Sequence, residues 1–260
     1  HVEAGLRTGN NDSPWPEEIN RKIITAVSSL HFAPTKINKK NLLNENILPK
    51  NIFKTKNTVI DTLKEELKKL KGQRLKKLKD KYNFLNYEKK LILVTGHRRE
   101  NLKNNSFKQV CLFLNLISQF KEFQIVLQMH LNPEVKKIIK NTIKNDKIKI
   151  IKPVDYNSFI YLLKRSYLAI SDSGGIQEET AYLGIPLILT RLNTERPEGY
   201  SYNSIKINKI NVDNLKKVFF KLINNRFFYK TKMKKTNIFG HGKSSKAIYT
   251  VMKKLFKNDK

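Results

Sequence analysis

The stretch "DSGGIQEE", from Asp172 to Glu179, follows the apolar run "YLAIS" and precedes "TAYLGIP". This order predicts a strand that ends, turns on two glycines and starts a helix, which is the usual site for a bound phosphate. Gly174 and Gly175 let the backbone approach an anion, toward which the free N–H groups of the helix would point. Ser173 adds a hydroxyl donor, and Glu179 can accept hydrogen bonds from a ribose diol. The stretch therefore predicts a site for a nucleoside diphosphate.

The same strand–helix alternation runs through the chain from about residue 90 onward. The predicted strands are "LILVT", "FQIVLQ", "KIKII", "YLAIS", "PLILT" and "SIKI", and segments of helical periodicity separate them. Strands that alternate with helices imply a parallel sheet covered on both faces, a doubly wound α/β domain. The helix after the glycine turn is expected to stop at Gly184 and Pro186. In such sheets, ligands bind beyond the carboxyl ends of the strands.

The pattern before residue 90 differs, and we predict three segments. Residues 1–56 combine strand-like runs with a helix over "EEINRKIITAVSS" and look like the C-terminal part of a first Rossmann-like domain. Residues 57–235 form the nucleotide-binding Rossmann-like domain, which includes a lysine-rich helix or helix pair over residues 62–90. Residues 236–260 form a C-terminal segment, expected to be a helix that packs back toward the first domain.

The net charge is +30, from 52 basic and 22 acidic residues in a chain of 260. A nucleic-acid or membrane surface as partner would be one explanation. The lysines, however, are spread over nearly every predicted helix face, and residues with AT-rich codons are abundant throughout. We therefore expect codon bias and solvated helix faces, with no specific nucleic-acid partner.

Cysteine content and hydropathy narrow the class of protein further. Cys111 is the only cysteine, so an intramolecular disulfide and a cysteine-based metal cluster are excluded. It lies in the apolar stretch "VCLFLNLI", where core packing is its expected role. No apolar run approaches the roughly 18 residues of a membrane span, and no signal peptide is visible. We expect no membrane insertion and a cytoplasmic location.

Further reactive side chains lie at predicted strand ends, where chemistry is expected. Glu3 lies in "HVEAGLRTG", Glu17 in "PWPEEINR", His97 in "TGHRREN" and Arg196 in "TERPE". Each has an ordinary structural explanation alone, since carboxylates favour helix starts and a surface ion pair is worth little. Together with the glycine turn they fit one anionic ligand. The sequence has no metal-ligand spacing, Walker sequence or G-x-G-x-x-G, so neither a metal nor another cofactor is expected.

A series of motifs runs along the chain: "HVEAGLRTG", "PWPEEINR", "NTVID", "TGHRREN", "HLNP", "DSGGIQEE", "LGIP" and "TERPE". In order and spacing it resembles the non-hydrolysing UDP-N-acetylglucosamine 2-epimerases. The resemblance implies two Rossmann-like domains of glycosyltransferase-B type, the first of them incomplete here, and a homodimer. It also implies interconversion of UDP-GlcNAc and UDP-ManNAc without NAD or metal, in the biosynthesis of cell-surface polysaccharides.

The resemblance assigns roles in an elimination and re-addition of UDP. Glu3 and Glu17 match the family's acid/base carboxylates, which would move the proton at carbon 2 of the sugar. His97 matches a histidine at the diphosphate, a candidate acid toward the leaving oxygen, and both Glu3 and His97 would contact the substrate. The other matches are UDP contacts, namely Ser173, Gly174, Gly175, Glu179 and Arg196, with Phe159 as the aromatic residue near the uracil.

Departures from the family pattern bear on activity. The family has an earlier segment, with a glycine loop and a further catalytic aspartate, that the printed sequence does not include. We therefore expect the 260 residues alone not to catalyse epimerisation, and an inactive fragment is one alternative. Lys56 stands where the family usually has glycine before "NTVID". The other alternative is a glycosyltransferase of the same architecture. Glu3 and Glu17 argue against it, because a transferase needs no carboxylates aimed at carbon 2.

Overall fold

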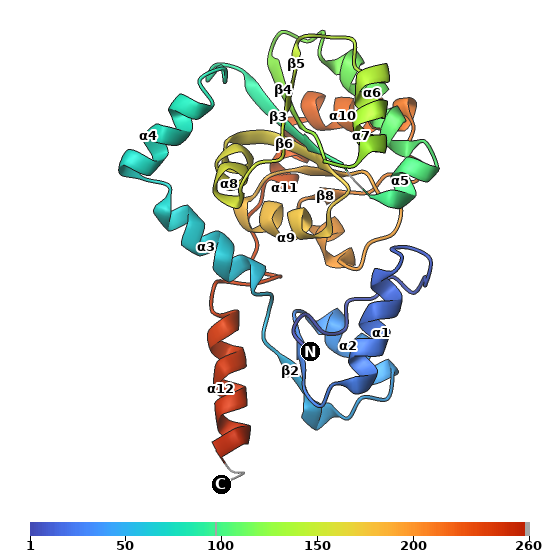
Figure 1. Cartoon of the computed structure of the whole chain (residues 1–260), viewed down its shortest axis with the longest axis vertical. Helices are drawn as coiled ribbons and strands as arrows, with labels where there is room; N and C mark the ends of the chain where they lie inside the picture. Colours follow the sequence, from blue (N-terminus) through green and yellow to red (C-terminus); the bar gives the residue numbers. More distant parts are fainter. Residues whose placement is uncertain (97, 258–260) are drawn as a thin grey trace. The chain divides into compact units, whose positions relative to one another are not determined.

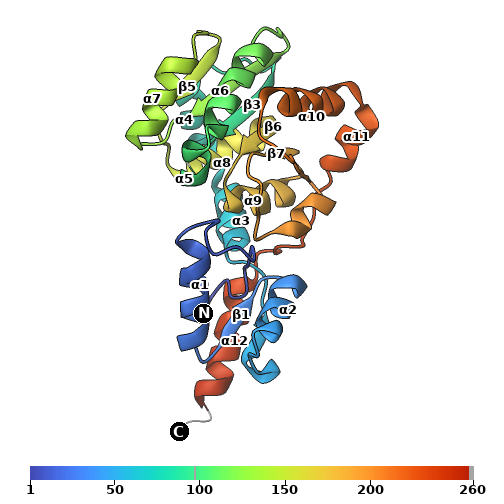
Figure 2. The same cartoon turned by 90° about the vertical axis from the view of Figure 1, so that its right-hand side faces the viewer.

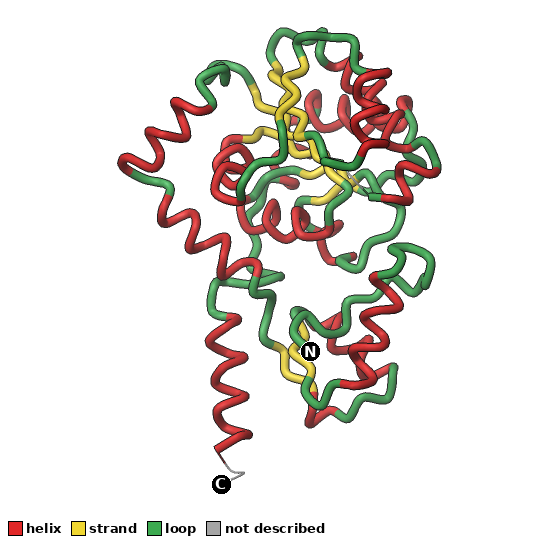
Figure 3. The backbone as a smooth tube through the Cα atoms, in the orientation of Figure 1, coloured by secondary structure: helices red, strands yellow, loops and turns green. Residues whose placement is uncertain are grey.

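A computed structural model describes residues 1–96 and 98–257 of the chain (Figures 1 and 3). The chain forms two compact units. Unit 1 comprises His1–Glu65, Asn193–Pro197 and the stretch from Thr236, and unit 2 comprises Glu66–Leu192 and Glu198–Lys235. The segments 1–56, 57–235 and 236–260 remain a prediction about domains. In the structure, residues 57–65 and the final stretch group with the N-terminal residues.

In the described part of the chain, unit 2 is built on a sheet of six parallel strands. The strands are β3 (Lys90–Thr95), β4 (Phe123–Gln128), β5 (Ile148–Ile151), β6 (Ser166–Ser171), β7 (Leu187–Leu189) and β8 (Ser204–Ile205). Their order across the sheet is β5-β4-β3-β6-β7-β8. This is a doubly wound order, which switches direction between β3 and β6, and such a switch point is where ligands bind. Thr95 of β3 lies beside Ser171 of β6 at the carboxyl edge.

Helices cover both faces of this sheet. One face packs against α6 (Ser106–Ile117), α7 (Pro133–Thr142) and α10 (Val212–Asn224), which Figure 2 shows together. The strands contact α8 (Tyr156–Arg165) and α9 (Gly174–Leu183) on the other face. Both faces are buried, which is why the strands read as continuous apolar runs in the sequence. Shorter or peripheral helices of unit 2 are α4 (Gly72–Lys81), α5 (Arg99–Lys103) and α11 (Arg226–Lys232).

The ends of the site-bearing helices follow from local sequence. α9 ends at Gly184 as predicted, with φ of 75° and an N–H that bonds to the Thr180 carbonyl at 2.8 Å. A Cβ at Gly184 would lie 2.4 Å from the Met233 carbonyl oxygen, so the position requires glycine. On α6, Cys111 is fully buried and burial raises its pKa to about 12, which confirms its expected place in the core.

Unit 1 contains a parallel pair of short strands, β1 (His31–Ala33) and β2 (Ile52–Lys54). A single bridge from Val2 to Phe32 extends this pairing. The helices of this unit are α1 (Glu17–Val27), α2 (Lys36–Asn44), the first part of α3 (Val59–Lys69) and α12 (Ser244–Lys257). A small buried cluster of Ala4, Ala33, Leu42 and Ile52 lies between the strands and α2.

The start of α12 is anchored to unit 1 through Asp61. The two carboxylate oxygens of Asp61 accept hydrogen bonds from the backbone N–H groups of Ser244 at 3.0 Å and Ser245 at 2.7 Å. The Ser244 hydroxyl donates to the Asn57 carbonyl at 3.1 Å. An anionic group that satisfies the first N–H groups of a helix also complements its dipole. Residues separated by more than 180 positions are thereby joined.

Lys56 occupies a backbone conformation that favours glycine. Its φ of 68° lies in the left-handed region, which costs a residue with a Cβ about 1–2 kcal/mol. Its Nζ donates to the Ile238 carbonyl at 2.8 Å, a contact that glycine could not make. The geometry explains the glycine that the family resemblance led us to expect at this position.

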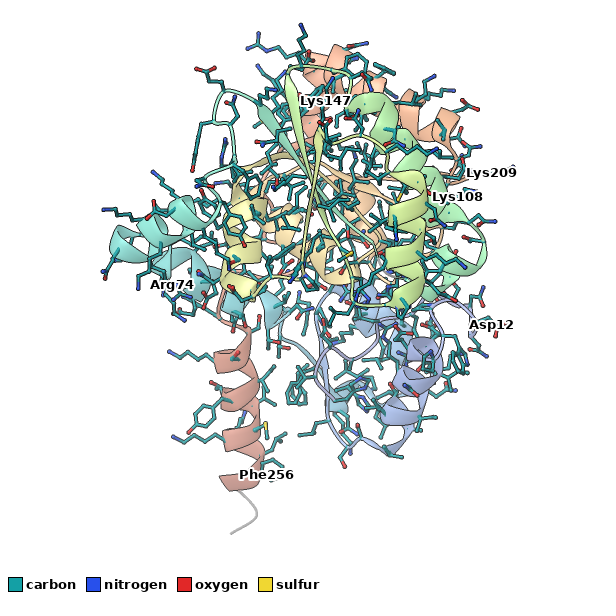
Figure 4. All side chains as sticks on the ribbon, turned by 45° about the horizontal axis from the view of Figure 1, so that its top comes forward. Asp12, Arg74, Lys108, Lys147, Lys209 and Phe256 are labelled. Atoms are coloured by element: carbon teal, nitrogen blue, oxygen red, sulfur yellow. The ribbon has the colours of Figure 1, made fainter. Side chains whose placement is uncertain are left out.

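The surface lysines belong to separate elements, as the sequence predicts. Lys108 on α6, Lys147 before β5 and Lys209 before α10 are exposed and labelled in Figure 4. Within the described residues, the helices are too short or too polar to cross a lipid bilayer.

Candidate functional site

A cleft of about 320 Å³ opens at the carboxyl ends of the unit 2 strands. It is lined by Thr95, Gly96, Gln128, Met129, His130, Pro153, Tyr156, Phe159, Ser173, Gly175, Ile176 and Glu179. Four of the predicted contacts, Phe159, Ser173, Gly175 and Glu179, are thus brought together, and Gly174 begins α9 beside them. A cleft of this size, with apolar walls and a few polar groups, is typical of small-molecule sites.

The turn before α9 is held from the adjacent strand. The Ser173 N–H donates to the Ser171 hydroxyl at 3.0 Å, and the hydroxyls of Ser171 and Thr95 lie 2.7 Å apart. The Ser173 side chain makes no capping bond to α9, so the first N–H groups of this helix face the cleft without a side-chain cap. A Cβ at Gly175 would meet nothing within 4 Å. The position is therefore open, and its role as a ligand contact stays a prediction.

Asp172 braces the loops that follow three neighbouring strands. Its Oδ2 accepts from the Arg98 N–H and from the Asn101 Nδ2, each at 3.0 Å. The Asn101 amide also donates to the Thr190 carbonyl at 2.8 Å, after β7. Sequence reasoning missed this role of Asp172 and Asn101, although an acidic residue directly after a buried strand was a usable signal. The predicted site residue His97 lies outside the described residues.

Tyr156 is a second residue of the cleft that sequence reasoning missed. Its hydroxyl donates to Oε1 of Glu179 at 2.8 Å. Burial and then the neighbouring Glu179 raise the pKa of Tyr156, so the hydroxyl keeps its proton. The ring lies at a 26° interplanar angle to that of Phe159, with centroids 6.5 Å apart. The position of Tyr156 one helical turn before Phe159 was the available signal.

Unit 1 holds the other predicted residues in a chain of paired charges. Oε1 of Glu3 accepts from Asn57 and from Arg196, the latter at 3.3 Å. Arg196 also donates to Oε1 of Glu195 at 2.8 Å, and Arg21 donates to the same oxygen at 3.2 Å. Glu195 is 1% exposed, so its charge requires such partners. Glu3 has a φ of 61°, in the left-handed region that favours glycine.

Glu18 and Glu17 open α1 with different environments. Glu18 is fully buried, lies 3.8 Å from Arg21, and accepts backbone N–H bonds from Thr8 and Gly9 at 3.0–3.1 Å. It therefore fixes the loop that precedes the helix. Glu17 is partly exposed at the first position of α1. Of this pair, Glu17 is the carboxylate that solvent reaches, and Glu18 is structural.

The described part of the chain contains no cluster of side chains suited to a metal ion. No group of three His, Cys, Asp or Glu side chains among residues 1–96 and 98–257 could hold a metal ion. The groups present are carboxylates, arginines, hydroxyls and helix N–H groups, which suit an anionic organic ligand and proton transfer.

A doubly wound parallel sheet with a cleft at its switch point defines a Rossmann-like α/β protein, a class in which nucleotides commonly bind at that place. The chain belongs to the UDP-N-acetylglucosamine 2-epimerase family, whose profile matches residues 1–253. Family membership confirms the resemblance that the motifs indicate.

Relatives match almost the whole chain. The UDP-N-acetylglucosamine 2-epimerase of Neisseria meningitidis is 40% identical, over 98% of this chain and 69% of its own length. That of Campylobacter jejuni is 41% identical, over 97% of this chain and 67% of its own. The crystal structure of the Neisseria meningitidis enzyme bound to UDP-GlcNAc matches with a TM-score of 0.93 and 39% identity, over 98% of this chain and 69% of that one. The predicted fold class, α/β of glycosyltransferase-B type, is confirmed by this match.

Proposed function

We propose that the protein interconverts UDP-GlcNAc and UDP-ManNAc. The observation that carries the proposal is the match to the Neisseria meningitidis relative solved with UDP-GlcNAc bound, over 98% of a chain that itself presents a nucleotide-type cleft. No observation favours the glycosyltransferase alternative. As the family resemblance implies, we further propose a cytoplasmic homodimer.

The proposed binding step uses the residues that the family resemblance assigns to UDP. In unit 2, Phe159 contacts the uracil, Glu179 accepts from the ribose diol, and Ser173 with the first N–H groups of α9 binds the diphosphate. Arg196 of unit 1 supplies a positive charge to the diphosphate. A guanidinium can make two parallel bonds to a phosphate, which favours this role for arginine over lysine.

The proposed chemistry is an elimination followed by an addition. One carboxylate, Glu3 or Glu17, removes the proton at carbon 2, the bond from carbon 1 to the UDP oxygen breaks, and UDP leaves with the bonding pair. His97 protonates or neutralises the leaving oxygen. The 2-acetamidoglucal that remains is protonated at carbon 2 on its opposite face by the other carboxylate, and UDP adds back to carbon 1. These reaction steps are redox-neutral overall, so no hydride acceptor takes part.

The test follows hydrogen at carbon 2. The chain is joined to the part of the Neisseria meningitidis relative that it does not match, which is 31% of that relative's length because the match covers 69%, and UDP-GlcNAc is supplied in deuterium oxide. We expect UDP-ManNAc with deuterium at carbon 2, and release of free UDP and 2-acetamidoglucal as occasional side products, measured by NMR and mass spectrometry. Epimerised product that retained its original hydrogen would contradict the elimination route. No epimerised product at all would contradict the proposed function.

A further inference from the structure

In one wall of the unit 2 cleft, a hydrogen bond joins two helices. Tyr156 is the first residue of α8, and Glu179 lies in the middle of α9. The tyrosine hydroxyl donates to Oε1 of Glu179 at 2.8 Å, and both residues line the cleft. Glu179 is 4% exposed, so this bond acts in an environment largely shielded from water.

The first turn of α8, which carries Tyr156, is held by a helix cap, a lysine and a ring contact. Asp155 caps α8 by accepting from the Ser158 N–H at 2.8 Å. Lys81 donates to the Ser158 hydroxyl at 3.0 Å and lies 3.3 Å from the Asp155 carboxylate. The Tyr156 ring packs beside that of Phe159. The hydroxyl therefore has a fixed position, from which it can orient a partner.

A glutamate side chain has three rotatable bonds, and a ligand that must order it loses affinity. A donor that already fixes Glu179 removes that loss before the ligand arrives. A carboxylate has about four acceptor positions, so a bond from Tyr156 is compatible with further bonds from the two hydroxyls of a ribose.

We propose that Tyr156 is the positioning residue for Glu179 and thereby sets the preference of the cleft for a ribose with intact 2′ and 3′ hydroxyls. This inference rests on the proposed function, in which Glu179 accepts from the ribose diol. Tyr156 acts through Glu179, and the recognised feature is the diol of a uridine diphosphate.

The test compares two nucleotides on three variants of the full chain. Uridine diphosphate and its 2′,3′-dideoxy analogue are titrated calorimetrically into the wild type, Tyr156→Phe and Glu179→Gln. Tyr161→Phe is the matched control, since it lies on the same helix and its hydroxyl bonds to that of Tyr87 at 2.7 Å, outside the residues that line the cleft. Thermal unfolding of each variant is measured in parallel.

We expect Tyr156→Phe to weaken uridine diphosphate binding about three- to tenfold. The variant loses one hydrogen bond to the charged Glu179, and this loss affects the ligand only through the position of Glu179. Binding of the dideoxy analogue should stay unchanged. The ratio of the affinity for uridine diphosphate to the affinity for the dideoxy analogue therefore decreases, and we describe this decrease as a narrowing of the ratio. Glu179→Gln should narrow it further, and Tyr161→Phe should leave it at the wild-type value.

Two results separate the possible failures. If Glu179→Gln narrows the ratio but Tyr156→Phe leaves it as in the control, Tyr156 is only structural and the inference is wrong. If Glu179→Gln itself leaves the ratio unchanged, the ribose contact in the proposed function is wrong, and the inference falls with it. Equal weakening of both nucleotides by Tyr156→Phe would also overturn the inference, because a loss of fold would not distinguish the diol.

Discussion

Unit 1 and unit 2 present their polar groups to a ligand in opposite ways. In unit 1, the carboxylates and arginines compensate one another, and the Arg196 side chain, 7% exposed, is shared between Glu3 and Glu195. In unit 2, the cleft has apolar walls and uncharged or singly charged polar side chains, among them Ser173, Tyr156 and Glu179. An anion that binds Arg196 must exchange one charged partner for another, whereas a nucleoside that enters the unit 2 cleft displaces mainly water.

In the function that we propose, two tasks are divided along this contrast. Proton transfer requires charged groups whose partners can change during the reaction, and unit 1 has them. Recognition requires fixed shape and a few oriented donors and acceptors, and unit 2 has those. The Glu3 side chain is 41% exposed, so its pair with Arg196 is partly screened by water and is weak enough to be exchanged.

The largest expected effect tests whether chemistry depends on unit 1. In the joined protein, Glu17→Gln keeps the shape of the side chain but removes its capacity to transfer a proton. We expect epimerisation to slow by about 100-fold or more, with uridine diphosphate affinity unchanged, measured by a coupled assay and by calorimetry. The control is Glu45→Gln, which removes another unit 1 carboxylate, one paired with Arg7 at 2.6 Å. If Glu17→Gln turns over substrate as fast as the control, proton transfer does not depend on Glu17, and the proposed division of tasks is wrong.

An intermediate effect tests whether unit 1 also takes part in binding. Arg196→Ala should weaken uridine diphosphate binding about ten- to a hundredfold, the value of one charge-assisted contact. Arg7→Ala, which removes a unit 1 arginine paired with Glu45, is the control and should leave the affinity unchanged. Binding of uridine by itself, which has no diphosphate, should be the same in all three proteins. Unchanged affinity of Arg196→Ala for uridine diphosphate would show that Arg196 does not bind the diphosphate. Recognition of the nucleotide would then be confined to unit 2.

The smallest effect concerns the frame of the unit 2 cleft. Asp155→Ala removes the cap of α8, which should lower the free energy of unfolding by about 1 kcal/mol at neutral pH. The hydrogen bond from the Ser158 N–H, with help from the Ser158 hydroxyl and Lys81, holds the pKa of Asp155 below its usual range. The stabilisation is therefore present above the ordinary pKa of aspartate and is lost as the pH falls through the depressed value. Urea unfolding at neutral and acid pH should show the difference between wild type and variant shrinking in acid, and a constant difference would contradict this account.

The parts of the molecule that sequence predicted best are those set by local patterns. β4 and α10 begin and end at the expected residues, and the strand–turn–helix around Ser173 follows from apolar runs and two glycines. β7 and β8 are shorter than the runs that suggested them, because hydrophobic runs do not reveal where pairing with a neighbour stops. β8 ends at Ile205, two residues before the end of "SIKI".

Contacts between distant residues could not be read from the sequence in the same way. The Arg21–Glu195 pair joins residues 174 positions apart, and no local periodicity links them. Tyr156 and Glu179 are only 23 apart, but their meeting depends on how α8 and α9 pack on the sheet. Patterns identify side chains that suit a chemistry, whereas partners are set by tertiary structure. This is why Arg196 and Glu179 were predicted as site residues and their partners Glu195 and Tyr156 were not.

Unit 1 draws on three separate stretches of the chain, and this has a consequence for the order of folding during synthesis. Most of unit 2 is complete once the ribosome has made residues 66–235, apart from the short excursion Asn193–Pro197. Unit 1 includes residues 1–65, yet the hydrogen bond of Asp61 requires Ser244, and that of Glu3 requires Arg196. Unit 1 is therefore completed after unit 2, because its contacts join residues 1–65 to stretches that are translated after most of unit 2.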